Sequence, residues 1–302
     1  MSCSQRLPIR IERETSPEVA EPTVDELNNL VRDIGGADNH FLVVDRVPQL
    51  PRRFIQTYRD GDGAFDVEYR DGAEMYETSV ADPATVAALI LAWAAEEADW
   101  KRGADWTQSF QDSDQLVPPV DDEAADYARQ TARRFIDHGY SSYNDILQAI
   151  MDGAEPDDPI IRPQAEAILE PLWLERVAEQ RSWPEVTDAD RVNEVFDQLC
   201  HNGITAKTNF TCCMSCGTAE IRGEAIEGDR GYVFFHQQDA EHAIDGSLYL
   251  AYGAYADGEA ASLAVGREVV EAFTAAGMTT RWDGTLAQRI QVVELDWKHR
   301  LR

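Results

Sequence analysis

The sequence predicts an α+β N-terminal domain, followed by a helical segment and an α/β domain of four to five strands. Three patterns lead to this fold class. Apolar and polar residues alternate in short runs between residues 40 and 80, which is typical of strands with one buried face. Apolar residues recur at helical spacing between 122 and 202, and strand-like and helix-like segments alternate after residue 203. A length of 302 residues is sufficient for two domains of ordinary size.

Residues 1–22 contain three prolines and charges of both signs, so we predict a mobile tail. Residues 23–106 are predicted to form the α+β domain, an antiparallel meander plus a packed helix. Thr23 and Glu26 form a capping box that starts the first helix. Phe65, Val67 and Tyr69 alternate with polar residues in a central strand of the meander.

The second half of the chain begins after a polar stretch, residues 107–121, which contains two adjacent prolines and is predicted to be a linker. The helical segment then covers residues 122–202 and the α/β domain residues 203–302. Five strands are predicted in the α/β domain, at residues 204–210, 232–238, 248–252, 278–282 and 289–295.

The charge of the chain limits its partners. The formal net charge is −29, with 56 acidic and 27 basic residues. Nucleic acids and anionic membranes are therefore excluded as expected partners, because phosphate groups require a basic surface. A basic protein partner remains electrostatically favourable. We also expect a cytoplasmic protein, because no run of apolar residues is long enough to cross a bilayer and the N-terminus lacks the apolar core of a signal peptide.

Three of the five cysteines lie within five residues, at Cys212, Cys213 and Cys216, directly after the first strand of the predicted α/β domain. The end of the second strand carries His236, Gln237, Gln238 and Asp239, and Asp239 is expected to cap the helix that follows. If the first two strands are parallel, their carboxyl ends meet, and Cys213 comes close to His236. The ends of the third and fourth strands would join the same edge if those strands were also parallel.

Four interpretations of the cysteine cluster remain open. Zinc could be held by Cys212, Cys213, Cys216 and His236, because the Cys-x-x-Cys spacing lets two thiolates face one ion. Cys200, His201 and His242 are further ligand candidates for that ion.

A thiol redox centre would use Cys213 and Cys216, at a strand end before a helix. Nucleophilic catalysis would use a cysteine activated by His236 and oriented by Asp239, so the catalytic candidates are Cys213, Cys216, His236 and Asp239. Alternatively, the thiols only pack as small apolar groups, as we expect for Cys200 on an apolar helix face.

The segment Asn209–Ile221 resembles the signature of an uncharacterised actinobacterial family. Gly231–Asp239 and Leu248–Gly253 resemble later blocks of the same family, so the similarity covers about residues 118–298. The resemblance implies no known activity. The N-terminal part, with Asp45-Arg46 and Val67–Gly72, is similar to a short acidic actinobacterial module, also uncharacterised. Its compact α+β form is similar in kind to that of bacterial immunity proteins.

These observations favour a non-enzymatic binding or regulatory protein in which the cysteine cluster is structural or holds zinc. A thiol-dependent enzyme or redox protein that uses Cys213 and Cys216 is the alternative. A third hypothesis is an immunity-like module that binds a basic protein partner.

Overall fold

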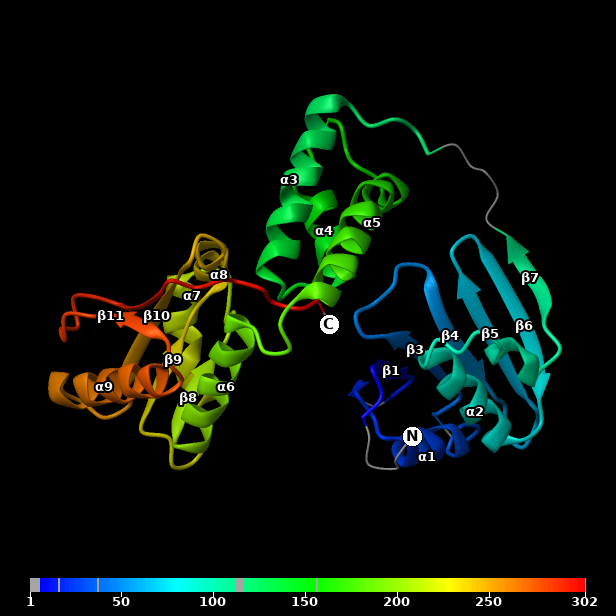
Figure 1. Cartoon of the computed structure of the whole chain (residues 1–302), viewed down its shortest axis with the longest axis horizontal. Helices are drawn as coiled ribbons and strands as arrows, with labels where there is room; N and C mark the ends of the chain where they lie inside the picture. The colour runs from blue at the N-terminus through cyan, green and yellow to red at the C-terminus, as the bar shows by residue number, and fades with distance from the viewer. Residues whose placement is uncertain (1–5, 16, 37, 112–116, 156, 302) are drawn as a thin grey trace. The chain divides into compact units, whose positions relative to one another are not determined.

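The computed structural model describes residues 6–15, 17–36, 38–111, 117–155 and 157–301 (Figure 1). The chain divides into two compact units, Met1–Val120 with Leu301–Arg302, and Asp121–Arg300. Each unit has a hydrophobic core of its own. The predicted mixed architecture is confirmed, since an antiparallel sheet with helices precedes a group of helices and a mixed sheet.

The first unit is built on a sheet of seven strands in the order β2-β1-β3-β4-β5-β6-β7, with every pair antiparallel. Its elements are β1 (Ile9–Arg13), β2 (Val19–Ala20), α1 (Val24–Arg32), β3 (Phe41–Arg46), β4 (Arg53–Tyr58), β5 (Phe65–Asp71), β6 (Glu74–Val80), α2 (Pro83–Ala94), η1 (Trp100–Gly103) and β7 (Thr107–Gln111). Helices α1 and α2 contact each other on one face of the sheet (Figure 1). The alternation predicted for β5 is confirmed, because Phe65, Val67 and Tyr69 are buried.

Two predictions for this unit are wrong. Residues 6–22, predicted as part of a mobile tail, include β1, which pairs with β3 over its whole length. Leu7, Ile9 and Ile11 alternate with polar residues and are buried in the core, so a strand period was present there despite the prolines. Thr107–Gln111, predicted as linker, is the edge strand β7. Residues 1–5, 16 and 112–116 of the predicted tail and linker lie outside the described residues.

The second unit starts with helices and continues with a sheet of five strands in the order β11-β12-β10-β9-β8. Its elements are α3 (Asp122–His138), α4 (Tyr143–Asp152), α5 (Arg162–Glu179), η2 (Gln180–Ser182), α6 (Asp188–His201), β8 (Ile204–Lys207), α7 (Met214–Glu220), η3 (Ile221–Glu224), β9 (Gly231–Phe234), α8 (Gln237–Ile244), β10 (Ser247–Ala254), α9 (Glu259–Ala275), β11 (Thr279–Arg281) and β12 (Ile290–Val293). Side chains of Asp121, Ser142 and Thr187 cap the starts of α3, α4 and α6.

Only one pair of strands in this five-stranded sheet is parallel. β8 and β9 run in the same direction, as the sequence argument required. β10 is antiparallel to both β9 and β12, and β12 is antiparallel to β11. The idea that the ends of the third and fourth strands join the edge of the first two is therefore wrong. The carboxyl end of β10 lies beside the amino end of β9, where Ala254 is opposite Gly231.

The two faces of this sheet carry different helices. Val233 and Phe235 belong to the main core, to which α6 and α9 contribute. Tyr232 and Phe234 point to the opposite face, because successive side chains of a strand alternate, and they pack with Ile221 and with residues of α7. The segment α7–η3 thus covers the second face, beside the carboxyl ends of β8 and β9.

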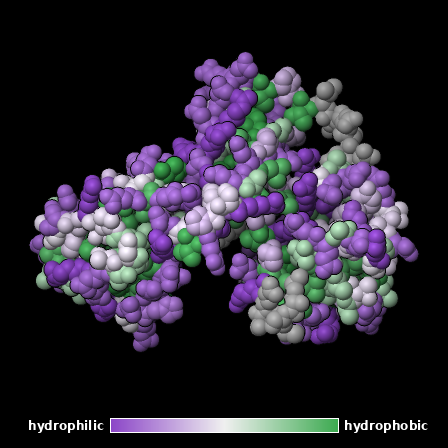
Figure 2. All heavy atoms as spheres, viewed as in Figure 1, coloured by the Kyte–Doolittle hydropathy of each residue, from purple (hydrophilic) through white to green (hydrophobic). Residues whose placement is uncertain are grey.

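The surface is mostly polar. In Figure 2 hydrophilic residues cover most of the visible face, with hydrophobic residues scattered among them. Throughout the described part of the chain, no helix has both the length and the apolar character that a membrane span requires.

Candidate functional site

The loop that carries the cysteines is fixed to the end of β9 by backbone hydrogen bonds. The N–H of Phe210 donates to the carbonyl of Phe235 at 2.8 Å, and the N–H of Gln237 donates to the carbonyl of Thr211 at 3.1 Å. Asn209 and Thr211 adopt φ values of 46° and 63°, so the chain turns sharply there. The parallel pairing of β8 and β9 places the cysteine loop beside the start of α8.

Helix α7 lies close to the sheet because of Gly217. A Cβ atom at this position would lie 2.4 Å from a ring carbon of Phe234, which is fully buried. Gly217 therefore lets the helix backbone rest on the aromatic ring. With this face buried, Cys212 is exposed while Cys213 and Cys216 are half-buried.

The three sulfur atoms of the cluster lie within 4.8 Å of one another. The sulfurs of Cys212 and Cys216 are 3.7 Å apart. The pKa of the Cys213 thiol is lowered, mainly because the backbone N–H of Cys216 stabilises its thiolate. The pKa of Cys216 is raised to about 11, first by the neighbouring sulfur of Cys212 and then by that of Cys213. The raised pKa of Cys216 means that the three thiols do not all lose their protons easily. A cation between the sulfurs would favour all three thiolates.

A second polar cluster lies beyond the end of β9 and is buried. Asp239, only 2% exposed, receives two hydrogen bonds from Arg289, with Nη1 2.9 Å from Oδ1 and Nη2 2.5 Å from Oδ2. Nε2 of His236 lies 3.1 Å from Oδ2 of the same carboxylate. The pKa of His236 is lowered, because burial outweighs the opposing effect of the Asp239 charge. Arg289 also donates to the carbonyl of Tyr249 at 2.7 Å.

Comparison with known proteins now adds one finding. The profile of a domain of unknown function (DUF6891) matches residues 121–301, which is more than half of the chain. The chain belongs to this family. Residues 121–301 include both polar clusters and the whole five-stranded sheet. No curated protein matches the chain, and no solved structure matches it either.

The DUF6891 domain brings only some of the predicted site residues together. Among the described residues, the group of ligand atoms within 4.8 Å consists of the sulfurs of Cys212, Cys213 and Cys216. His236 interacts with Asp239 instead, and its Nδ1 atom is buried without a hydrogen bond to any described residue. Asp239 is not the N-cap of α8 as predicted, since His236 occupies that position and donates its backbone N–H to the Asp239 carboxylate at 3.2 Å.

Cys200 was expected in the core, and this prediction is wrong. The residue is exposed near the end of α6, and its thiol donates to the carbonyl of Ala206 at 3.4 Å. Leu199 fills the inward position of that helical turn instead. Cys200 does not belong to the cysteine cluster, so it is a thiol against which the cluster can be compared.

The sequence analysis missed Arg289. It is 50 residues from Asp239 and precedes β12, so no local motif connects the two. The signal that could have suggested it is indirect. A carboxylate at the start of a short helix behind a buried strand needs a cation, and Arg289 begins one of the segments predicted to be a strand.

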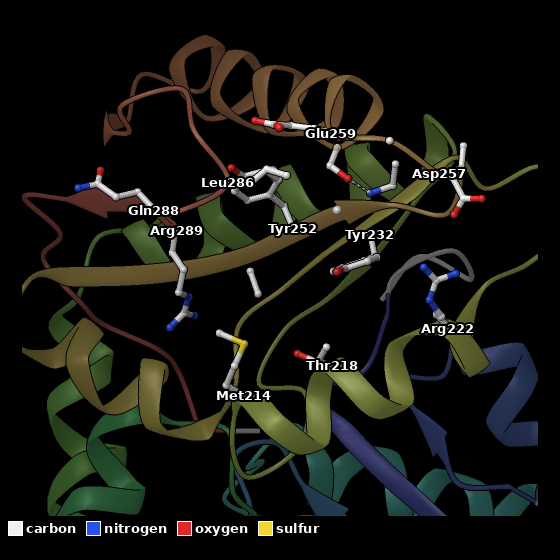
Figure 3. Close-up of a pocket in the computed structure, with 16 residues that line it drawn as sticks. Met214, Thr218, Arg222, Tyr232, Tyr252, Asp257, Glu259, Leu286, Gln288 and Arg289 are labelled. Atoms are coloured by element: carbon white, nitrogen blue, oxygen red, sulfur yellow. Dashed lines mark hydrogen bonds between the residues drawn. The ribbon is translucent and has the colours of Figure 1, made fainter.

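Arg289 also lines a cleft of about 520 Å³ on the α7 face of the sheet (Figure 3). Met214, Thr218 and Arg222 follow one another at four-residue spacing along one wall. The ring of Tyr232 lies over Gly253, where a Cβ atom would be 2.6 Å from the tyrosine hydroxyl oxygen. Sequence analysis did not find this cleft, because its lining comes from five separate segments.

Proposed function

We propose that the cluster of Cys212, Cys213 and Cys216 binds a zinc ion and that the protein acts by binding rather than by catalysis. The supporting observation is the spacing of the three sulfurs, all within 4.8 Å, with one pair at 3.7 Å. Tetrahedral zinc with Zn–S bonds of about 2.3 Å requires sulfurs roughly 3.8 Å apart. Small side-chain movements would therefore bring three thiolates onto one ion, with a fourth position left for water or a partner's group.

The surroundings of the cluster favour binding over catalysis. Cys212 is exposed, whereas catalytic electrostatics depend on a site from which water is excluded. The nearest base that the sequence suggested, His236, is turned toward Asp239, and its remaining ring nitrogen makes no hydrogen bond to a described residue. These contacts therefore favour binding over nucleophilic catalysis by a cysteine–histidine pair.

Metal analysis of the whole chain, purified without chelators and without added metal, tests the proposal. We expect close to one zinc ion per chain, and less than about one tenth of that after the combined substitution Cys212→Ser, Cys213→Ser and Cys216→Ser, because a site with no thiolate loses its soft ligands. Cys200→Ser is the matched control, since it removes an exposed thiol outside the cluster, and it should retain the zinc. Equal metal content in the wild-type and triple-substituted chains would contradict the proposal.

A thiol redox function is the second candidate. It is supported by the lowered pKa of Cys213 and by the proximity of its sulfur to two others. After treatment with hydrogen peroxide, which is reduced to water, mass spectrometry would detect a disulfide within the peptide that contains the cluster, as the loss of two hydrogen atoms (two protons and two electrons). If zinc-free protein forms no such disulfide, and Cys213 is no more reactive toward alkylating reagents than Cys200, the redox candidate is eliminated.

A further inference from the structure

The cleft on the α7 face is separate from the cysteine sulfurs, although both lie along α7. Met214, Thr218 and Arg222 point into it from α7 and η3, and Tyr232 projects from β9 (Figure 3). A volume of about 520 Å³ falls in the range of sites for small molecules, about 300–1,000 Å³. The zinc proposal makes no use of this cleft.

One wall of the cleft contains Arg289, which is held in position by hydrogen bonds to other residues of the protein. Asp239, 2% exposed, binds Arg289 through both carboxylate oxygens, and the carbonyl of Tyr249 accepts a further hydrogen bond from it. Transferring a carboxylate and part of a guanidinium out of water is unfavourable, and apolar residues can fill such a space at no loss of stability. The pair therefore fixes the position of the Arg289 guanidinium at the wall of the cleft.

A second arginine lies at the other end of the row formed by Met214, Thr218 and Arg222. Arg222 follows Met214 by eight residues, across the junction of α7 with the 3-10 helix η3, and a rise of about 1.5–2.0 Å per residue places them roughly 12–16 Å apart. Arg222 is exposed and stacks on Tyr255, with its guanidinium carbon 5.7 Å from the ring centroid. It forms no ion pair with any described residue, although the chain has 56 carboxylates and only 27 basic side chains.

Backbone and hydroxyl donors complete the cleft. The N-terminus of α9, a helix of 17 residues, opens onto it through Gly258, Glu259 and Ser262. Gly258, the N-cap, has no side chain to satisfy the first N–H groups, which therefore remain available to a ligand. Asp257 and Glu259 also line this region. Figure 3 shows that Asp257 lies at the same end of the cleft as Arg222, and that the Glu259 carboxylate is directed along α9, away from Met214 and Thr218.

We propose that this cleft binds a small organic molecule through an anionic group, a carboxylate or a phosphate, that pairs with Arg222. Thr218 and the uncapped turn of α9 donate hydrogen bonds to the same group. Arg289, held by Asp239, donates to a polar group at the other end of the molecule, and Tyr232 packs against its central part.

Titration calorimetry with two probes, inorganic phosphate and succinate, tests this proposal at constant ionic strength. We expect at least one probe to bind the whole chain with a Kd of about 1 mM or tighter. The preferred probe distinguishes a phosphate ligand from a carboxylate ligand. Arg222→Gln should weaken binding at least tenfold without changing the Tm of the free protein, because the side chain is exposed and forms no ion pair.

Arg267→Gln is the matched control, since it removes an exposed arginine of α9 that does not line the cleft. It should leave the Kd unchanged. Thr218→Trp fills the cleft without a change in charge and should abolish binding. Repeating the titration with the chain that lacks the three cluster cysteines separates this proposal from zinc binding. The proposal is overturned if neither probe binds, or if Arg222→Gln and Arg267→Gln bind equally well.

Discussion

Beyond the ends of β8 and β9 lie two polar clusters that differ in their chemistry and in how deeply their central residues are buried. The cysteine cluster is at the surface, and its three sulfurs contact mainly one another. The cluster of His236, Asp239 and Arg289 is largely buried, and its carboxylate has all of its hydrogen bonds within the protein. We therefore expect the exposed cysteines to bind an ion with little effect on the fold, and the Asp239–Arg289 pair to stabilise the fold as well as to position Arg289 at the cleft. Substitutions should separate these two roles.

The largest effect is expected for Asp239→Asn. The substitution keeps the shape of the side chain but leaves the Arg289 guanidinium without its counter-charge and removes an acceptor from the backbone N–H of His236. Breaking a buried charge pair costs about 3–5 kcal/mol. Because Arg289 is 31% exposed and can move toward water, we expect a loss of about 2–3 kcal/mol in the free energy of unfolding, measured with urea.

Asp257→Asn provides the control for Asp239→Asn. It removes the same charge from an exposed carboxylate of the same domain, so its effect should stay within about 0.5 kcal/mol. Equal stability of the two variants would mean that the buried cluster contributes no more to folding than a surface carboxylate does.

The next effect concerns pH, and a buried histidine elsewhere in the DUF6891 domain provides the reference for His236. His138 is fully buried in α3, and burial lowers its pKa to about 4, with smaller contributions from His299 and Arg134. The unfolded chain, with a histidine pKa of 6.5, binds the proton more readily than the folded chain. The contribution of neutral His138 to the free energy of unfolding is therefore fully present above pH 6.5, and it declines as the pH falls toward 4.

At pH 5, preferential protonation of His138 in the unfolded chain should lower the free energy of unfolding by about 2 kcal/mol relative to pH 7. Urea unfolding at both values measures the difference, and His138→Gln should remove it even if the variant is less stable at pH 7. His236→Gln should remove a smaller part, because the Asp239 charge opposes the lowering of the His236 pKa. A pH dependence that both substitutions leave intact would have to come from other groups.

Much of the fold could be predicted because its signals are local. The alternation of Phe65, Val67 and Tyr69 identified β5, and the capping box of Thr23 and Glu26 identified the start of α1. The prediction of a mobile tail was wrong because it gave more weight to the three prolines than to the alternation of Leu7, Ile9 and Ile11 with polar residues. Prolines outside the strand interior do not prevent pairing, so the apolar alternation should have decided the prediction.

The candidate site was predictable only in part. Three cysteines in five residues are visible in any sequence, and their sulfurs do lie together. Strand direction is set by tertiary packing, so the sequence could show neither that β8 and β9 are parallel nor that β10 is not. The pairing of Asp239 with Arg289, and the cleft that Arg289 lines, depend on contacts across 50 residues that no local pattern records.

The smallest effect on folding is expected in the cysteine cluster. Cys212 is exposed, and its sulfur lies 3.7 Å from that of Cys216. In the presence of a chelator, Cys212→Ser should therefore change the free energy of unfolding by less than about 0.5 kcal/mol.

Without the chelator, zinc at one hundred times its Kd should stabilise the wild-type chain by about 2.7 kcal/mol, because it binds the folded state in preference to the unfolded state. Cys212→Ser should lose most of this gain, whereas Asp239→Asn should retain it despite its lower stability. If Cys212→Ser instead destabilises the metal-free protein as much as Asp239→Asn does, the cysteines serve the fold itself and the contrast between the two clusters disappears.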